Sequence, residues 1–176
     1  MDKLENQPCP ICGEKKCTLL EEEIDIPFFG KTFAFGMDCS ACGFHMSDVE
    51  AADEKDPVKI TFVVENKNDL KARVVKSAKA TLSIPTLRVK ISPGSGSEGY
   101  VSNIEGVLKR LKIVVEKQRD AADDKDVKKK AKNLLKKIWK IECGDMPMKI
   151  IIEDLSGNSA IISEKAEVIK LKKKKK

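Results

Sequence analysis

The sequence predicts an α+β chain, in which a cysteine-bearing β-ribbon precedes a β-rich domain with an inserted helical hairpin. Three observations lead to this prediction. Apolar residues alternate over much of the chain, helical spacing replaces the alternation after about residue 103, and two cysteine pairs flank the first alternating segment. Alternation is typical of strands, and apolar residues three or four positions apart are typical of amphipathic helices. We expect the ribbon over residues 1–50, the β-rich domain over 51–171 and a disordered lysine tail over 172–176.

The ribbon is predicted from two alternating apolar sets with a turn between them. The first set is Ile24, Ile26 and Phe28, and the second is Phe33, Phe35 and Met37. Gly30-Lys31 lies between the sets, and glycine is common in the tight turns of hairpins. We therefore expect a hairpin that turns at Gly30-Lys31.

The β-rich domain is predicted from further alternating segments. They lie at 58–64, 78–84 and 87–91, with shorter ones at 150–152, 160–162 and 168–171. Between them, two amphipathic helices are expected over about 103–143, because the apolar residues there follow helical spacing. Asn103 is a suitable N-cap, and Gly144 and Pro147 are suitable to end the second helix.

Charge is unevenly distributed along the 176 residues, whose formal net charge is +6. Six lysines lie in the last seven residues, and without them 28 basic residues balance 28 acidic ones. Residues 1–50 carry a net charge of −6, and residues 107–142 carry +7. A neutral body weakens the case for a general nucleic-acid binder. We expect the tail to tune solubility or weak contacts with anions.

The N-terminus is polar and resembles no signal peptide, and no apolar run approaches the ~18 residues of a membrane span. We therefore expect a soluble cytoplasmic protein without a membrane partner. Cysteines stay reduced in that compartment and serve as metal ligands more often than as disulfides.

The cysteines form two pairs of Cys-x2-Cys spacing. Cys9 and Cys12 make the first pair, and Cys39 and Cys42 follow after 26 intervening residues. Four thiolates in a tetrahedron suit Zn²⁺ and leave no open coordination position, so we expect one structural zinc ion. An iron–sulfur centre or a redox dithiol is the alternative. His45 could compete as a ligand, but we expect a solvated or packing role for it.

A series of short motifs resembles the ZPR-one zinc-finger family of archaea and eukaryotes, over about residues 7 to 163. The motifs are Cys9-Pro10-x-Cys12-Gly13, Ile26-Pro27-Phe28-Phe29, Cys39-x2-Cys42-Gly43-Phe44, Asp69-Leu70, Val74-Val75-Lys76-Ser77, Ile84-Pro85-x-Leu87, Ile104-Glu105-Gly106 and Gly157-Asn158-Ser159. Their common order makes the match specific. The chain departs from the family at Ser102-Asn103 and Thr86, where members often have a Thr pair and a Glu.

The resemblance implies a zinc ribbon joined to a domain of the double-stranded β-helix type that carries a helical hairpin. It also implies a single module, as in archaeal members, where eukaryotic members have two. Family members bind translation elongation factor one-alpha and assist its folding. The resemblance therefore implies this factor as the partner of the chain.

Two further segments are candidates for partner binding. Alternation places Phe28 and Phe29 on opposite faces of the ribbon, so one of them packs on the second domain or binds a partner. Gly157, Asn158 and Ser159 suit a turn, and a partner contact is the alternative.

Catalysis and nucleotide binding find little support in the sequence. Gly94, Gly96 and Gly99 match the spacing of a dinucleotide fingerprint, but a second helix follows where that fold needs a strand. A single histidine beside a cysteine pair is a poor general base for a distant nucleophile. We expect a loop at residues 92–99 and no enzymatic activity.

The helical hairpin is strongly basic around its apolar face. The lysines are Lys128, Lys129, Lys130, Lys132, Lys136, Lys137 and Lys140. They form a solvated face, or dock on an acidic protein or RNA, although Trp139 alone gives no interleaved aromatics for base stacking. Our interpretation is a non-enzymatic, zinc-stabilised protein-binding module. The alternative is a zinc-ribbon RNA- or ribosome-binding protein that uses the hairpin and the tail.

Overall fold

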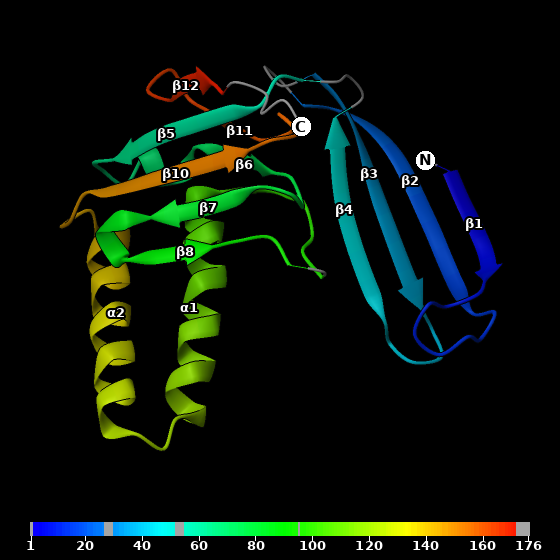
Figure 1. Ribbon diagram of the computed structural model, residues 1–176, viewed down its shortest axis with the longest axis horizontal. Helices are drawn as coiled ribbons and strands as arrows, with labels where there is room; N and C mark the ends of the chain where they lie inside the picture. The colour runs from blue at the N-terminus through cyan, green and yellow to red at the C-terminus, as the bar shows by residue number, and fades with distance from the viewer. Residues whose placement is uncertain (1, 27–29, 52–54, 95, 172–176) are drawn as a thin grey trace.

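A computed structural model describes residues 2–26, 30–51, 55–94 and 96–171. Figure 1 shows two bodies side by side, a ribbon formed by the first strands and a β-rich body from which two helices extend. The described part of the chain begins on the ribbon. The lysine tail, residues 172–176, lies outside the described residues.

The ribbon is an antiparallel sheet with the strand order β1-β2-β3-β4. Its strands are β1 (Asp2–Gln7), β2 (Cys17–Ile26), β3 (Gly30–Cys39) and β4 (His45–Ala51). The turn predicted at Gly30-Lys31 is wrong, because both residues belong to β3 and pair with Ile26 and Asp25 of β2. Alternation identified both strands, but it does not mark the residue at which pairing ends.

The β-rich body consists of two sheets that face each other. The strands of the first sheet, in the order β12-β5-β10-β7-β8, are β12 (Glu167–Lys170), β5 (Val58–Val64), β10 (Met148–Asp154), β7 (Thr81–Ile84) and β8 (Val89–Ile91). The strands of the second sheet, in the order β11-β6-β9, are β11 (Ala160–Ile162), β6 (Arg73–Lys76) and β9 (Tyr100–Asn103). Short 3-10 turns lie at η1 (Asp69–Lys71) and η2 (Pro85–Leu87).

The predicted helical hairpin is confirmed and consists of α1 (Ile104–Ala121) and α2 (Lys125–Cys143). As predicted, the Asn103 side chain caps α1, where it accepts a hydrogen bond of 2.7 Å from the Gly106 amide. Gly144 ends α2 in the left-handed conformation, with a φ of 81°. Among the described residues, no helix is both long and apolar enough to cross a membrane.

One hydrophobic core joins the sheets to the helices. Its fully buried members include Ile60, Phe62, Leu82, Ile104, Leu108, Ile138, Ile150 and Ile152. The strand β10 lies between β5 and β7, and its residues Ile150 and Ile152 are buried. The helices therefore pack their apolar faces onto the sheet and leave their charged faces outside.

The ribbon meets the β-rich body where β4 approaches β9. The Asp48 carboxylate accepts hydrogen bonds from the amides of Gly99 (3.0 Å) and Val49 (2.8 Å). A Cβ atom at position 99 would lie 2.6 Å from an Asp48 oxygen, so this close approach requires glycine. The glycine at the end of the supposed dinucleotide fingerprint therefore serves the junction between the two bodies. The loop leads into β9, which the sequence analysis missed, before the helix begins.

Candidate functional site

The four predicted metal ligands converge at one end of the ribbon. The Sγ atoms of Cys9, Cys12, Cys39 and Cys42 all lie within 4.8 Å of one another. The Cys9–Cys42 and Cys12–Cys39 sulfur pairs are separated by 3.7 and 3.8 Å. A zinc ion with bonds of about 2.3 Å to four tetrahedral sulfurs requires sulfurs about 3.8 Å apart. The cysteines are thus positioned to bind one zinc ion.

Two matching knuckles hold the sulfurs in place. The Gly13 amide donates to the Cys9 carbonyl (2.9 Å), and the Gly43 amide donates to the Cys39 carbonyl (3.0 Å). Both glycines have positive φ, 75° and 71°, as expected from their place after each second cysteine. The Ile11 amide donates a hydrogen bond to the Cys9 sulfur (3.4 Å).

Backbone amides close to the Cys9 sulfur stabilise its thiolate form. Hydrogen bonds from the amides of Cys12 and Ile11, against the opposing effect of burial, lower the pKa of the Cys9 thiol to about 7. Hydrogen bonds from the Glu14 and Phe44 amides are outweighed by burial and by hydrogen bonds to the other cysteines, which instead raise the pKa values of the Cys12 and Cys42 thiols. Zinc binds thiolates, so these thiols lose their protons when the metal enters. The four protein ligands complete a tetrahedron, which is the arrangement of a structural zinc site.

His45 is not a member of the four-sulfur group. Its Nδ1 atom lies 2.6 Å from an oxygen of Asp38, and both side chains are more than half exposed. This contact raises the pKa of the His45 imidazole through the hydrogen bond and the charge of Asp38. Cys17 is completely buried against Cys9 and Cys39, and it forms a small apolar cluster beneath the metal centre.

A buried carboxylate that the sequence analysis did not identify lies at the end of β10. Asp154 is fully buried and accepts hydrogen bonds from the hydroxyls of Ser77 (2.8 Å), Ser159 (2.6 Å) and Ser156 (2.6 Å). Burial raises the pKa of the Asp154 carboxyl, but the hydrogen bonds from the serines outweigh it and lower that pKa. Asp154 thus connects β10 with the residue after β6 and the residue before β11, and so links the two sheets.

This network explains two of the recognised motifs. Ser77 ends one motif, Ser159 ends another, and the Ser77 amide donates to the Ser159 hydroxyl over 3.0 Å. Gly157 has a φ of 72°, and a Cβ atom there would meet the Asp56 carbonyl oxygen at 2.4 Å. Asn158 is half-buried and lines a small cavity at the junction with the ribbon. These contacts support the turn interpretation of residues 157–159 and give it a structural reason.

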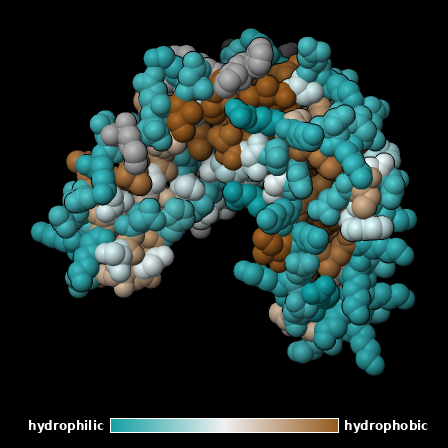
Figure 2. Space-filling view, turned by 180° about the vertical axis from the view of Figure 1, so that it is seen from behind, coloured by the Kyte–Doolittle hydropathy of each residue, from teal (hydrophilic) through white to brown (hydrophobic). Residues whose placement is uncertain are grey.

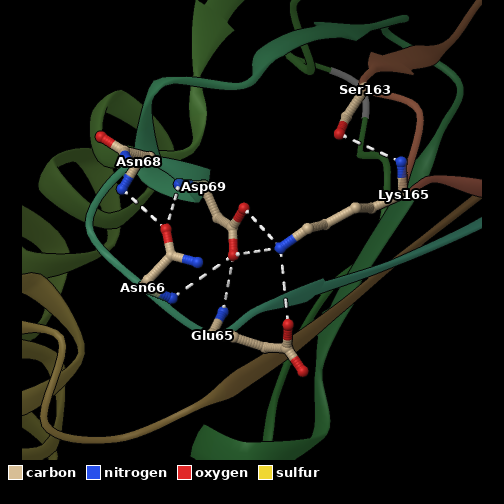
Figure 3. Close-up of polar contacts among 6 residues, drawn as sticks. All are labelled: Glu65, Asn66, Asn68, Asp69, Ser163 and Lys165. Atoms are coloured by element: carbon tan, nitrogen blue, oxygen red, sulfur yellow. Dashed lines mark hydrogen bonds and ion pairs between the residues drawn. The ribbon is translucent and has the colours of Figure 1, made fainter.

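A second polar cluster explains the Asp69-Leu70 motif (Figure 3). The Asp69 carboxylate accepts hydrogen bonds from the amides of Glu65 (2.9 Å) and Asn66 (3.3 Å), and from the Lys165 ammonium at 3.1 and 3.2 Å. These contacts, the Glu65 amide first, lower the pKa of Asp69. The cluster ties η1 to the loop between β11 and β12, residues almost a hundred positions apart, and its role is structural.

Phe28 and Phe29 lie outside the described residues, so their partner-binding role stays a prediction. The strand that leads to them ends in Ile24, Asp25 and Ile26, which line one side of a cleft of about 520 Å³. Val101 and Arg73 of the β-rich body line its other side. The described end of the ribbon thus opens onto a cleft between the two bodies.

The fold and the metal centre define a class of protein that joins a four-cysteine zinc ribbon to a jelly-roll domain with two helices. The family models agree, since the ZPR1 zinc-finger domain matches residues 3–57 and the ZPR1 jelly-roll domain matches residues 68–175. The chain belongs to the ZPR1 family.

Relatives extend over most of the chain. An uncharacterized ZPR1-like protein of Methanocaldococcus jannaschii is 38% identical over 95% of this chain and 85% of its own length. A second one, from Pyrococcus horikoshii, is 40% identical over 94% of this chain and 76% of its own. The zinc finger chaperone zpr1 of Schizosaccharomyces pombe is 31% identical over 87% of this chain, which spans only 33% of that relative. The relatives thus include a chaperone of the zinc-finger type.

Proposed function

We propose that this chain is a cytoplasmic protein-binding module that binds translation elongation factor one-alpha and assists its folding or assembly. The observation that carries the proposal is the match to the ZPR1 family over both the ribbon and the jelly roll. The family resemblance supplies the partner, and a relative named as a zinc finger chaperone supports the chaperone role. Reduced cysteines at the metal centre are consistent with the cytoplasm.

The zinc ion has a structural task in this proposal. Among the described residues of the ribbon, the buried hydrophobic residues are Cys9, Cys17 and Cys39 at the metal centre, and Ile26 at the other end of β2. Metal binding supplies the folding free energy that so small a core lacks. Zinc thus fixes the strands that lead to the partner-binding segment.

The partner contact is proposed at the far end of the ribbon, at Phe28 and Phe29. The neighbouring cleft exposes apolar side chains from both bodies, with Ile24 39% and Val101 41% exposed. Exposed apolar residues around a cleft are suited to receive a partner segment, and aromatic residues often dominate such contacts.

The test measures affinity for elongation factor one-alpha by titration calorimetry, with zinc-loaded chain. Phe28→Ala and Phe29→Ala are each expected to weaken binding by at least about tenfold if they are hot spots. Leu4→Ala is the matched control, because Leu4 is 60% exposed on β1, an outer strand of the same ribbon. Unchanged affinity in both phenylalanine variants would reject the contact site, and no binding by the unaltered chain would reject the partner.

A further inference from the structure

The outer face of α2 is an unusual helix surface. Eight lysines and two acidic residues lie between Lys125 and Cys143, and all eight lysines are exposed. None of the eight is within ion-pair distance of a carboxylate in the described part of the chain. The nearby ion pairs are Arg119 with Asp120, and Lys112 of α1 with Glu142. In Figure 2 the outer side of the hairpin is accordingly hydrophilic.

Four of these lysines follow one another at every fourth position. We refer to Lys128, Lys132, Lys136 and Lys140 as the lysine row. Neighbours in the row are about 6 Å apart along the helix axis. Like charges at this spacing destabilise a helix, and a merely solvated face normally interleaves acidic residues. The row contains no acid, so its repulsion is screened by salt ions or by a polyanion that lies along it.

Trp139 lies on this same face. It is 56% exposed, whereas the opposite side of α2 buries Ala131, Ile138 and Ile141 in the core. Trp139 follows Lys136 by three residues, which places the indole beside the lysine row. Trp139 is a single ring and not an interleaved series of aromatics, but its exposed position beside the lysines allows one base to stack on it while the lysines contact phosphates.

We propose that the lysine row and Trp139 form a binding site for single-stranded RNA. The lysines form a continuous line of positive charge along the helix, and lysine contacts a phosphate as a point charge. An exposed indole stacks on a base without regard to its identity, so the site has no strong sequence preference. Single-stranded RNA offers phosphates to the lysines and an unpaired base to the indole, whereas an acidic protein offers only the negative charge. This site is separate from the proposed partner site at the end of the ribbon.

The single tryptophan of the chain makes the test direct. An oligouridylate is titrated into the zinc-loaded chain of residues 1–176 while Trp139 fluorescence and the anisotropy of labelled RNA are followed. The proposal expects quenching, and a salt slope of log affinity near −3, at about −0.7 for each of four phosphates. Trp139→Phe should keep most of the binding measured by anisotropy, because a phenyl ring also stacks.

The variant Lys132→Gln/Lys136→Gln should weaken binding about tenfold at low salt and reduce the slope by about 1.4. The control is Lys90→Gln/Lys149→Gln, which removes two exposed lysines from strands β8 and β10 and leaves the same net charge. All variants keep the lysine tail, so its contribution is equal throughout. Absence of quenching, or equal losses in the two double variants, would overturn the proposal. Tighter binding of poly-glutamate than of RNA would assign the face to an acidic protein instead.

Discussion

Replacing Asp154 with alanine removes the carboxylate that connects the two sheets of the jelly roll. The carboxylate has no exposed surface and is the acceptor for the hydroxyls of Ser77, Ser159 and Ser156. Ser77 and Ser159 are themselves only 4% exposed, so water cannot easily replace the lost acceptor. The substitution therefore leaves at least two buried donors without their partner.

The expected loss follows from these contacts. An unsatisfied buried donor costs about 1–3 kcal/mol, so two of them cost about 4 kcal/mol of the free energy of unfolding. For a chain of this length, 1 kcal/mol corresponds to about 2–4 °C in Tm, which gives a decrease of about 8–16 °C. The zinc content should stay at one ion per chain, because the metal centre is in the ribbon.

The assay is thermal and urea unfolding followed by far-ultraviolet circular dichroism, in which the helical signal comes from α1 and α2 of the jelly roll. Glu153→Ala is the matched control. Glu153 precedes Asp154 in the same strand, and its carboxylate forms an exposed ion pair of 2.8 Å with Lys59. An exposed pair contributes about 0–1 kcal/mol, so Tm should fall by less than about 4 °C. Equal losses in the two variants would refute the reasoning about the buried network.

Further predictions concern the metal centre, one turn and acid stability. Cys12→Ser should lower the bound zinc well below one per chain in metal analysis, whereas Cys143→Ser, outside the metal centre, should keep it. Gly157→Ala should lower the free energy of unfolding by about 2–4 kcal/mol, because its φ is positive and a Cβ atom would strike backbone, whereas Gly94→Ala meets no atom within 4 Å. The pKa of Asp69 in the folded protein is below its ordinary value of 3.8. Its contribution to the free energy of unfolding is therefore present above pH 3.8 and is lost as the pH falls through the folded pKa. Asp69→Asn should therefore flatten the loss of stability below about pH 4, measured by urea unfolding, and an unchanged acid profile would contradict this role.

The metal centre was predictable from the sequence because its information is local. Two residues between the cysteines of a pair and a glycine after each pair describe a knuckle, and positive φ at Gly13 and Gly43 confirms it. The long ribbon between the pairs followed from alternation of apolar residues. The sequence did not predict that the Ile11 amide donates to the Cys9 sulfur, because this contact depends on the direction of the backbone within the knuckle.

The strands that escaped prediction lack alternation for physical reasons. In β1 almost every side chain is exposed, so no apolar face is repeated along it. In β6 the residues after Arg73 are all buried, so apolar and polar positions do not alternate either. The hairpin, by contrast, has one buried and one charged face, and helical spacing revealed it at once.

The polar networks could not be derived from the sequence. Asp154 and Ser77 are 77 residues apart, and only the placement of β10 and β6 in two facing sheets brings them together. Lys165 and Asp69 are 96 residues apart and meet through the same topology. The order of the family motifs indicated that these segments matter, but it did not indicate that they contact one another.

The measurement that tests the account most directly is the affinity of the chain for elongation factor one-alpha, with and without zinc. Isothermal titration of the zinc-loaded chain is expected to give saturable binding with one factor per chain. Removal of zinc by a chelator should abolish it, because the ribbon loses the metal that holds Cys9, Cys12, Cys39 and Cys42 together. No binding by the folded, zinc-loaded chain, or equal affinity after zinc removal, would contradict a zinc-stabilised module for this partner.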